Sequence, residues 1–461
     1  MAEGKGVRAN DGEASGFAAM KIEKAKKVAA LTLGCKVNFY DTEAILSVFC
    51  ENGYETADFD NVADVYVINT CTVTNLSDKK SRQMIRRAKT KNPNAIVVVT
   101  GCYAQASPDD VRKIDGVNII AGVKDKLKIF SAVENYAAES GVEEIVSDVS
   151  SVKYEPLKLS RFSERQRVFL KIEDGCNNFC SYCAIPYVRG RVSSRPSAEI
   201  LREAEKIAEN GFKEIVLTGI CLSAYGDDYL NEEKIDLTHV VSLINGVKGI
   251  ERVRLSSIEP TVITDEFLDS IKKLPKLCDH FHLPLQSGCD VTLKNMNRKY
   301  TTKQYATAVE KIRTAFPNAS VTADIIAGFP GESDYDFEKS IVFTENIGFM
   351  RLHAFPFSAK KGTAACRMSG QIPKAVKTTR TNRLLALSND LSKQFFNGFV
   401  GNDAVVLVEK ITEDGKIFGH TSNYMPVYAE AAANGKTNAN DFATVKLLSC
   451  DETAIYGKII K

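Results

Sequence analysis

Several features that commonly identify a protein's class are missing from this 461-residue sequence. No apolar run approaches the ~18 residues that a membrane-spanning helix needs, and the first 26 residues hold no apolar core of a secretory signal. We therefore expect a cytoplasmic protein that does not contact a membrane. Neither a G-x-G-x-x-G fingerprint nor a Walker loop occurs, so the common signatures of nucleotide binding are absent. A net charge of only +2 excludes a polybasic coat protein, although a local basic patch can still bind nucleic acid.

Hydrophobic periodicity predicts an α/β protein, and a chain of this length favours about three domains. Residues 1–26 are expected to form a disordered extension, and residues 141–165 a linker. Between them, over residues 27–140, buried strands alternate with amphipathic helices, which predicts an open parallel α/β sheet. The expected strands are Val28–Leu33, Val65–Asn69, Ile96–Thr100 and Val117–Ile120.

Residues 166–394 repeat the alternation of strand and helix patterns. A full TIM barrel needs eight such units, so six predict an incomplete (βα)6 barrel. The expected strands are Val168–Glu173, Glu214–Gly219, Arg252–Ser257, His280–Gln286, Val321–Ala327 and Arg351–Phe357. Residues 395–461 contain short β-like runs separated by turns, which predict a small all-β barrel.

One face of the central strands is polar, while the other is mostly aliphatic. Because helices cover the outside of such a barrel, the polar face is expected to point into the lumen. A polar lumen, with Arg252, Arg254 and Arg351 among its residues, fits an open barrel that holds a polar ligand. The alternative is that some of these strands are edge strands with one solvated face.

Three cysteines lie close together in Cys176-Asn-Asn-Phe-Cys180-Ser-Tyr-Cys183. They directly follow a predicted barrel strand, at the C-terminal face where barrel enzymes carry their chemistry. Spacings of three and two residues let one loop present three thiolates to a single iron–sulfur cube, whose fourth iron stays open. Structural zinc would need a fourth ligand, and none of the five histidines is near in sequence. Zinc and buried cysteines without a ligand are the alternatives.

Three further cysteines, Cys35, Cys71 and Cys102, each come just after a predicted strand of the N-terminal sheet. The carboxyl ends of parallel strands open on one edge of a sheet, so these distant residues can converge. Three converging thiolates again suggest a cluster with one open iron. The alternative is three buried cysteines, a common finding in itself.

The C-x3-C-x2-C spacing, with Tyr182 before the last cysteine and the segment Ile185–Gly190 after it, resembles the radical S-adenosylmethionine (SAM) superfamily. The resemblance implies that the open iron chelates SAM and that reduction of the cluster cleaves SAM to a 5′-deoxyadenosyl radical. Residues near predicted strand ends are candidates for SAM contact, although a structural role is as plausible for each: Thr218, Gly219, Ser256, Gln286 and Asp324.

From residue 27 onward, the layout resembles the methylthiotransferase family. This implies an auxiliary [4Fe–4S] cluster on Cys35, Cys71 and Cys102, a second [4Fe–4S] cluster and SAM in the barrel, and a C-terminal RNA-binding TRAM domain. Segments around Cys35, Cys71 and Phe355 resemble the branch that methylthiolates carbon 2 of N6-threonylcarbamoyladenosine next to the anticodon of tRNA (position 37). We expect a monomer that needs a reducing system of flavodoxin type; its sulfur donor stays open.

Other functions fit parts of the same pattern. Related branches act on isopentenyladenosine in tRNA or on an aspartate of a ribosomal protein. A non-enzymatic iron–sulfur electron carrier is a further alternative, although an open iron and a polar lumen argue against it. Cys221 and Cys289, just past barrel strands, are expected mainly to be structural, with a role in handling sulfur as the lesser alternative. No role is expected for four other cysteines: Cys50, Cys278, Cys366 and Cys450.

Residues 79–91 are rich in lysine and arginine and contain no acid. Such a run near the predicted auxiliary cluster favours contact with phosphates, although a solvated helix face is the usual interpretation. The candidate RNA-binding residues are Lys79, Arg82, Arg86, Arg87 and Lys89. Residues 395–461 carry more acidic than basic residues, so RNA contact there is expected through side chains such as Phe418, His420, Asn423 and Tyr424.

Overall fold

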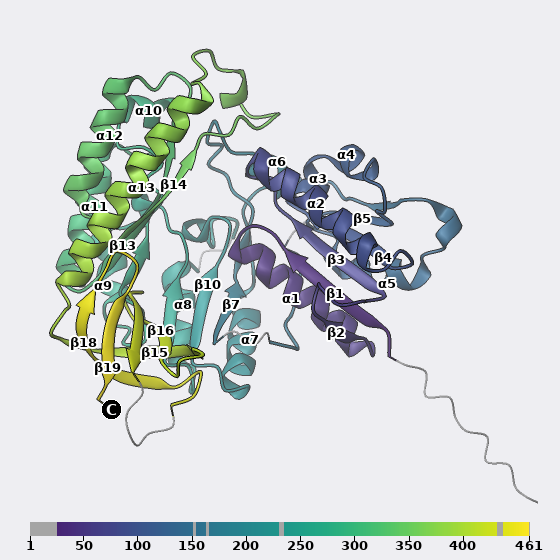
Figure 1. Ribbon diagram of the computed structural model, residues 1–461, viewed down its shortest axis with the longest axis horizontal. Coiled ribbons are helices and arrows are strands. Elements are labelled where there is room, and N and C mark those ends of the chain that lie inside the picture. The colour runs from purple at the N-terminus through teal and green to yellow at the C-terminus, as the bar shows by residue number, and fades with distance from the viewer. Residues whose placement is uncertain (1–24, 151–153, 163–165, 230–234, 431–436, 461) are drawn as a thin grey trace, which may run out of the picture.

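The computed structural model describes residues 25–150, 154–162, 166–229, 235–430 and 437–460. Nearly all of the predicted N-terminal extension lies outside these ranges. Figure 1 shows three parts: an α/β sheet domain, a central barrel wrapped by helices, and a small β-barrel at the C-terminal end of the chain. Among the described residues, no helix is long and apolar enough to span a membrane.

The N-terminal domain is a six-stranded parallel sheet of order β2-β1-β3-β4-β5-β6. Its strands are β1 (Lys27–Thr32), β2 (Glu55–Ala57), β3 (Val65–Thr70), β4 (Ile96–Gly101), β5 (Ile119–Ala121) and β6 (Glu143–Ile145). Its helices are α1 (Lys36–Glu51), α2 (Asn75–Lys91), α3 (Cys102–Ala106), α4 (Pro108–Arg112) and α5 (Ile129–Asn135). One face packs against α2 and the other against α1 and α5, which explains the continuously apolar central strands.

The two edge strands, β2 and β6, were not predicted. Strand β6 lies within residues 141–165, the predicted linker, and pairs with β5. It is three residues long with two glutamates, so it has no apolar run to reveal it. Leu157 and Leu159 from the same stretch are buried in the core of the central barrel.

The central domain contains six parallel strands in chain order, which confirms the incomplete barrel. They are β7 (Arg167–Lys171), β10 (Glu214–Thr218), β11 (Arg252–Leu255), β12 (His280–His282), β13 (Ser320–Ala327) and β14 (Arg351–Pro356). Two three-stranded sheets are joined through bridges such as Ser257–His282. The covering helices are α7 (Ser197–Glu209), α8 (Leu237–Gly246), α9 (Asp265–Ile271), α11 (Thr302–Ala315), α12 (Asp334–Ile347) and α13 (Lys374–Asn397).

Strand parity follows the prediction. Aliphatic residues of one parity, such as Ile215, Val253 and Ala323, pack under the helices in the largest apolar core. Residues of the other parity face inward. Short elements at the rim are β8 (Glu173–Asp174), β9 (Ser193–Ser194), α6 (Ile185–Val188) and α10 (Asp290–Asn295).

The C-terminal domain is a closed barrel of order β15-β16-β17-β19-β18, which confirms the predicted all-β fold. Its strands are β15 (Asp403–Ile411), β16 (Ile417–Thr421), β17 (Pro426–Glu430), β18 (Phe442–Cys450) and β19 (Ile455–Ile459). This barrel lies against the end of the central barrel where the strands begin (Figure 1). Arg254 Nη1 donates to Ser422 O at 2.7 Å, and Ser320 Oγ donates to Asn423 O at 2.5 Å.

Candidate active site

The loop after β8 carries Cys176, Cys180 and Cys183. It turns at Gly175, whose φ is +86° and where a Cβ would lie 1.9 Å from Arg191 O, so only glycine allows this close approach. The far side of the loop is held by Ser181 N, which donates to Met296 O at 3.0 Å. The fold therefore presents the three thiols from one braced loop at the barrel rim.

Hydrogen-bond donors approach these sulfurs. Arg298 Nη1 lies 3.3 Å from Cys180 Sγ, and Asn178 N lies 3.4 Å from Cys176 Sγ. A hydrogen bond with Cys221 lowers the pKa of Cys176 to about 7, while burial raises the pKa of Cys183 to about 12. Donors to sulfur tune and hold iron–sulfur clusters, so these residues fit a [4Fe–4S] group with three cysteine ligands.

The second cysteine set lies at the carboxyl edge of the N-terminal sheet. Cys35 caps α1, Cys71 follows β3 and Cys102 begins α3. A Cβ on Gly34 would lie 3.2 Å from Cys71 Sγ, so glycine lets the Cys35 loop approach Cys71. Burial and then the charge of Cys102 raise the pKa of Cys71 to about 11, and burial raises that of Cys102. The three thiols thus influence one another at this edge, and their ligation of a second cluster stays a prediction.

Two asparagines fix the loops that carry these cysteines. Asn38 Nδ2 donates to Leu33 O at 2.7 Å and to Thr70 O at 3.0 Å. Asn69 Nδ2 donates in turn to Asn38 O at 2.9 Å. The carboxyl edge of a parallel sheet leaves loop carbonyls unpaired. These side chains supply hydrogen-bond donors to them. Sequence reasoning had not assigned them a role.

The two cysteine sets are joined by a direct contact between domains. Helix α6, which follows the Cys176 loop, packs against α3 of the N-terminal sheet. Cys102, Val123 and Val188 form a buried cluster there. The barrel rim and the sheet edge therefore face each other across this contact.

The residues predicted to contact SAM lie along the inward-facing strand ends. Thr218 is buried, and a Cβ on Gly219 would lie 2.7 Å from Glu173 Oε2. Ser256 is buried, and its hydroxyl has no partner among the described residues. Gln286 has φ of +65°, uncommon for a residue other than glycine, and Asp324 pairs with His282 at 3.4 Å. Their contact with SAM stays a prediction.

The side chains of β14 differ in exposure according to their parity. Leu352 and Ala354 are buried under the helices, whereas His353 and Phe355, of the inward parity, are exposed. Lys36, the first residue of α1, is solvent-exposed and interacts electrostatically with Asp324 and His353. The charge of Lys36, next to Cys35, therefore acts on inward-facing residues of the central barrel. Sequence reasoning missed Lys36 because these partners lie about 290 to 320 residues later in the chain.

Three arginines expected to line the ligand lumen have another role. Arg252 donates to Val405 O at 2.8 Å, and Arg254 is held by Glu214 and by carbonyls of the C-terminal barrel. Arg351 donates to Glu452 O and Thr453 O, both at 3.3 Å. Their position at the start of the strands, where the C-terminal barrel docks, corrects the prediction.

The basic run forms most of α2, but its residues are not equivalent. Lys79, Lys80 and Arg86 are exposed. Arg82 Nη1 donates to Tyr103 OH at 3.2 Å, and Arg87 pairs with Asp60. Lys89 Nζ donates to Ala95 O at 2.7 Å, which fixes the turn after α2. Lys89 is therefore engaged in the fold, which corrects its prediction as a phosphate ligand.

The predicted RNA contact of the C-terminal barrel is also corrected for three of its residues. Tyr424 stacks between His280 and His420, with ring centroids 4.7 and 4.5 Å apart. Asn423 is buried, and its Nδ2 donates to Asn318 O at 3.0 Å. His420, Asn423 and Tyr424 therefore hold the two barrels together instead of facing RNA.

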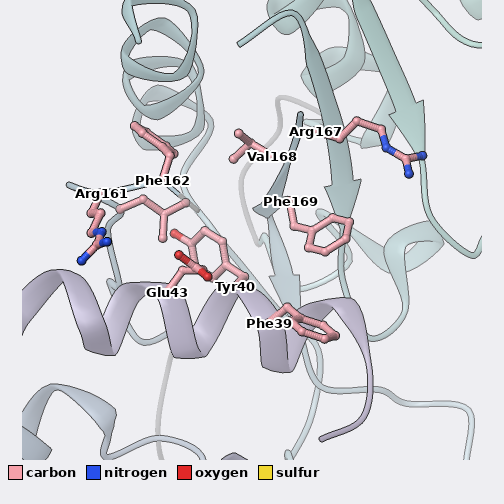
Figure 2. Close-up of a pocket in the computed structure, with 9 residues that line it drawn as sticks. Phe39, Tyr40, Glu43, Arg161, Phe162, Arg167, Val168 and Phe169 are labelled. Carbon is pink, nitrogen blue, oxygen red and sulfur yellow. The ribbon is translucent and has the colours of Figure 1, made fainter. Parts of the chain in front are cut away.

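A small cavity separates α1 from β7 (Figure 2). Figure 2 shows Tyr40 and Glu43 of α1 on one side and Val168 and Phe169 on the other. Its volume is about 20 Å³, whereas sites for small ligands have volumes of roughly 300–1,000 Å³. This cavity is a packing gap between domains and is too small for a ligand.

Comparisons with known proteins agree with this geometry. The model described as Uncharacterized protein family UPF0004 matches residues 27–122, and the Radical SAM superfamily model matches residues 170–344. The threonylcarbamoyladenosine tRNA methylthiotransferase MtaB of Bacillus subtilis is 44% identical over 405 residues, covering 87% of this chain and 89% of that protein. The chain belongs to the radical-SAM tRNA methylthiotransferase family. Membership implies a [4Fe–4S] cluster and SAM.

Other relatives place this methylthiotransferase within its family and fold. The tRNA-2-methylthio-N(6)-dimethylallyladenosine synthase of Clostridium novyi is 34% identical over 437 residues, covering 93% of this chain and 95% of that protein. The radical S-adenosylmethionine methyltransferase TsrM of Kitasatospora setae, solved with tryptophan and a SAM analogue, aligns with a TM-score of 0.54. That match has 13% identity and covers 72% of this chain and 73% of the other, so it shows the fold alone.

Proposed function

We propose that this enzyme methylthiolates carbon 2 of N6-threonylcarbamoyladenosine at position 37 of tRNA, using two [4Fe–4S] clusters and two molecules of SAM. The observation that carries the proposal is the pair of three-cysteine sets facing each other across the contact between α3 and α6. One set alone would serve SAM cleavage, whereas a transferred sulfur group calls for a second site. An external reductant, of flavodoxin type, and a monomeric enzyme complete the proposal.

The chain's own residues have separable roles in this reaction. Cys176, Cys180 and Cys183 would hold the cluster that supplies reductive cleavage of SAM to a carbon-centred radical. Arg298 donates to Cys180 and is fixed by Glu259 at 2.5 Å, so it keeps the loop in place. A radical is needed because carbon 2 of adenine carries no acidic proton for a general base to remove.

Cys35, Cys71 and Cys102 would hold the auxiliary cluster. Asn38 and Asn69 fix their loops through the hydrogen bonds described above. Cys35 is exposed, whereas Cys71 and Cys102 are buried. The open side of this set is therefore the side of Cys35, where a transferable group can meet the lumen.

The choice of base modification rests on Lys36. The threonylcarbamoyl group ends in a carboxylate, whereas a dimethylallyl group has no charge. An exposed ammonium at the lumen suits the carboxylate, because a charge-assisted hydrogen bond is stronger than a neutral one. Greater identity to the Bacillus subtilis protein, 44% against 34% for the Clostridium novyi synthase, supports the same choice.

The exposed cations of α2 support a polyanionic substrate. Lys79, Lys80 and Arg86 begin eight residues after Cys71, on the helix that follows that cysteine. Phosphate contacts there would guide a tRNA toward the sheet edge. A small-molecule substrate would need no such surface.

The test is mass spectrometry of nucleosides from tRNA. A strain lacking the gene should accumulate threonylcarbamoyladenosine without its 2-methylthio form, and the gene should restore the product. The purified enzyme should modify tRNA carrying threonylcarbamoyladenosine and leave dimethylallyladenosine tRNA unchanged. Equal activity on the two tRNAs would contradict the substrate, and modification of a ribosomal protein alone would contradict the RNA assignment.

A further inference from the structure

Arg189 is a fully buried arginine at the C-terminal end of α6, six residues after Cys183. It belongs to the central domain, yet its guanidinium reaches the other cysteine set: Nε lies 3.4 Å from Cys102 Sγ. Nη2 donates to Asn38 Oδ1, the side chain that also fixes the Cys35 loop. The segment of residues 176–189 thus begins with Cys176, a ligand of one proposed cluster. It ends with Arg189, which contacts Cys102, a ligand of the other proposed cluster.

The guanidinium is held firmly in this place. Nη1 lies 3.1 Å from both carboxylate oxygens of Asp174, and Nη2 lies 3.5 Å from Asp41 Oδ2. Asp174 comes from the barrel and Asp41 from α1 of the N-terminal domain. Arg189 is therefore oriented from both domains, and its Nε–H is left for the sulfur.

The surrounding network pairs buried charges of both signs. Three carboxylates face four basic side chains, all at the domain contact: Asp41, Glu155 and Asp174 against Lys124, Lys126, Lys171 and Arg189. Burial lowers the pKa of Lys124 and raises the pKa of Glu173 well above its usual range. Buried charge is costly unless it is compensated, and ligated thiolates at Cys102 and its neighbours would place negative charge beside the Arg189 guanidinium.

We propose that Arg189 is a positioning residue through which the radical-SAM domain completes the auxiliary cluster site and sets that cluster's reduction potential. The inference rests on the proposed function. A cationic N–H donor on a ligand sulfur stabilises the added electron of a reduced cluster, so it raises the potential. The auxiliary cluster then reaches its full reduction potential only when the radical-SAM domain is packed against the N-terminal domain.

The experiment isolates the auxiliary cluster in the full chain. Cys176, Cys180 and Cys183 are changed to Ala, the protein is reconstituted anaerobically, and iron content and the midpoint potential are measured, the latter by EPR-monitored titration. Arg189→Met in this background should retain about four irons. Its ratio of reduced to oxidised cluster at a fixed potential should fall at least tenfold, a negative shift of about 59 mV for one electron.

Arg195→Met is the matched control. Arg195 is also buried at the domain contact, where it bonds Tyr40 and Glu203 but no cysteine in the described structure. This variant should leave the potential unchanged. An equal shift in both variants, or none in Arg189→Met with the cluster bound, would overturn the inference.

A third variant covers loss of the cluster. If Arg189→Met retains no iron, Arg189→Lys is titrated in its place. This variant keeps the charge but loses the planar guanidinium, so its midpoint potential should also shift to a more negative value. The absence of iron from the Cys176/Cys180/Cys183→Ala chain with Arg189 intact would instead contradict the two-cluster function. The two failures are therefore distinguishable.

Discussion

At the scale of single residues, neighbours in the chain serve different parts of the site. Cys35 lies with Cys71 and Cys102 at the sheet edge, while the charge of Lys36 acts on Asp324 of the central barrel. Desolvation lowers the pKa of Lys36, and the charges of Tyr424 and Asp324 counteract this shift. The proposed function gives this side chain the role of recognising the carboxylate of the base modification.

Changing Lys36 tests that role. Lys36→Met should lower kcat/KM for threonylcarbamoyladenosine tRNA by about 10- to 100-fold, because a hydrogen bond between charged groups contributes roughly 1.5–3 kcal/mol. Lys36→Arg should retain most of the activity. Binding of tRNA and SAM cleavage without tRNA should change little. Lys113→Met, at an exposed lysine after α4 of the same domain, is the control. Unchanged selectivity over dimethylallyladenosine tRNA would contradict the assignment.

The six cysteines give a separate prediction about metal content. Anaerobic reconstitution should yield about eight irons per chain, and changing Cys176, Cys180 and Cys183 to Ala should leave about four. Changing Cys35, Cys71 and Cys102 to Ala should preserve SAM cleavage to 5′-deoxyadenosine but abolish methylthio transfer. Zinc in place of iron, or full transfer by the second variant, would refute the two-cluster arrangement.

At the scale of elements, α2 combines a structural face and an exposed basic face. Ile85 and Ala88 are buried against the sheet, and Thr74 caps the first turn by accepting from Ser77 N at 3.2 Å. Lys79, Lys80 and Arg86 point to solvent. The helix therefore depends on its apolar face for stability, and its exposed cations can change without loss of the fold.

Reversal of those charges tests the RNA surface. Lys79→Glu/Lys80→Glu/Arg86→Glu should weaken tRNA binding and lower the slope of log K against log salt by about 0.7–0.9 for each lost phosphate contact. SAM cleavage without tRNA should be unaffected. The control reverses three exposed lysines on other helices, Lys206, Lys339 and Lys393, for the same change in net charge. Equal weakening by the control would mean that net charge, and not α2, attracts the tRNA.

Elements and cysteines could be predicted because their signals are local. Each of Cys35, Cys71 and Cys102 comes just after an apolar run, so one pattern predicted both the strand and the cysteine at its carboxyl end. Strand parity correctly turned Arg252 and Arg254 inward. It could not show that the partner carbonyls lie more than 150 residues later, in the C-terminal barrel. Long-range partners of this kind leave no periodic trace in the sequence.

At the scale of the whole molecule, the two barrels are held together by a ring stack. His280, Tyr424 and His420 lie face to face, and His280 Nε2 contacts Thr322 Oγ1 at 3.1 Å. Burial, followed by the charge of Arg254, lowers the pKa of His280 well below its usual range. The folded protein therefore keeps this ring neutral.

This arrangement predicts loss of stability in mild acid. The unfolded chain binds a proton at His280 near pH 6.5 and the folded chain only at lower pH, so stability is present above that value and falls below it. Each proton bound only by the unfolded state costs about 1.4 kcal/mol per pH unit. Urea unfolding of the metal-free protein at about pH 7.5 and 5.5 measures the difference. His280→Gln should reduce the difference in the free energy of unfolding between the two pH values. His239→Gln, at an exposed site on α8, should leave that difference unchanged.

The C-terminal barrel also decides how the lumen can be filled. Because Arg252, Arg254 and Ser320 bond it to the end where the strands begin, the C-terminal barrel covers that end of the central barrel, opposite the rim that carries Cys176, Cys180 and Cys183. A macromolecule that binds at this rim would cover the cysteine loop. We therefore expect SAM to bind before the macromolecule does, and its cleavage products to leave after the macromolecule dissociates.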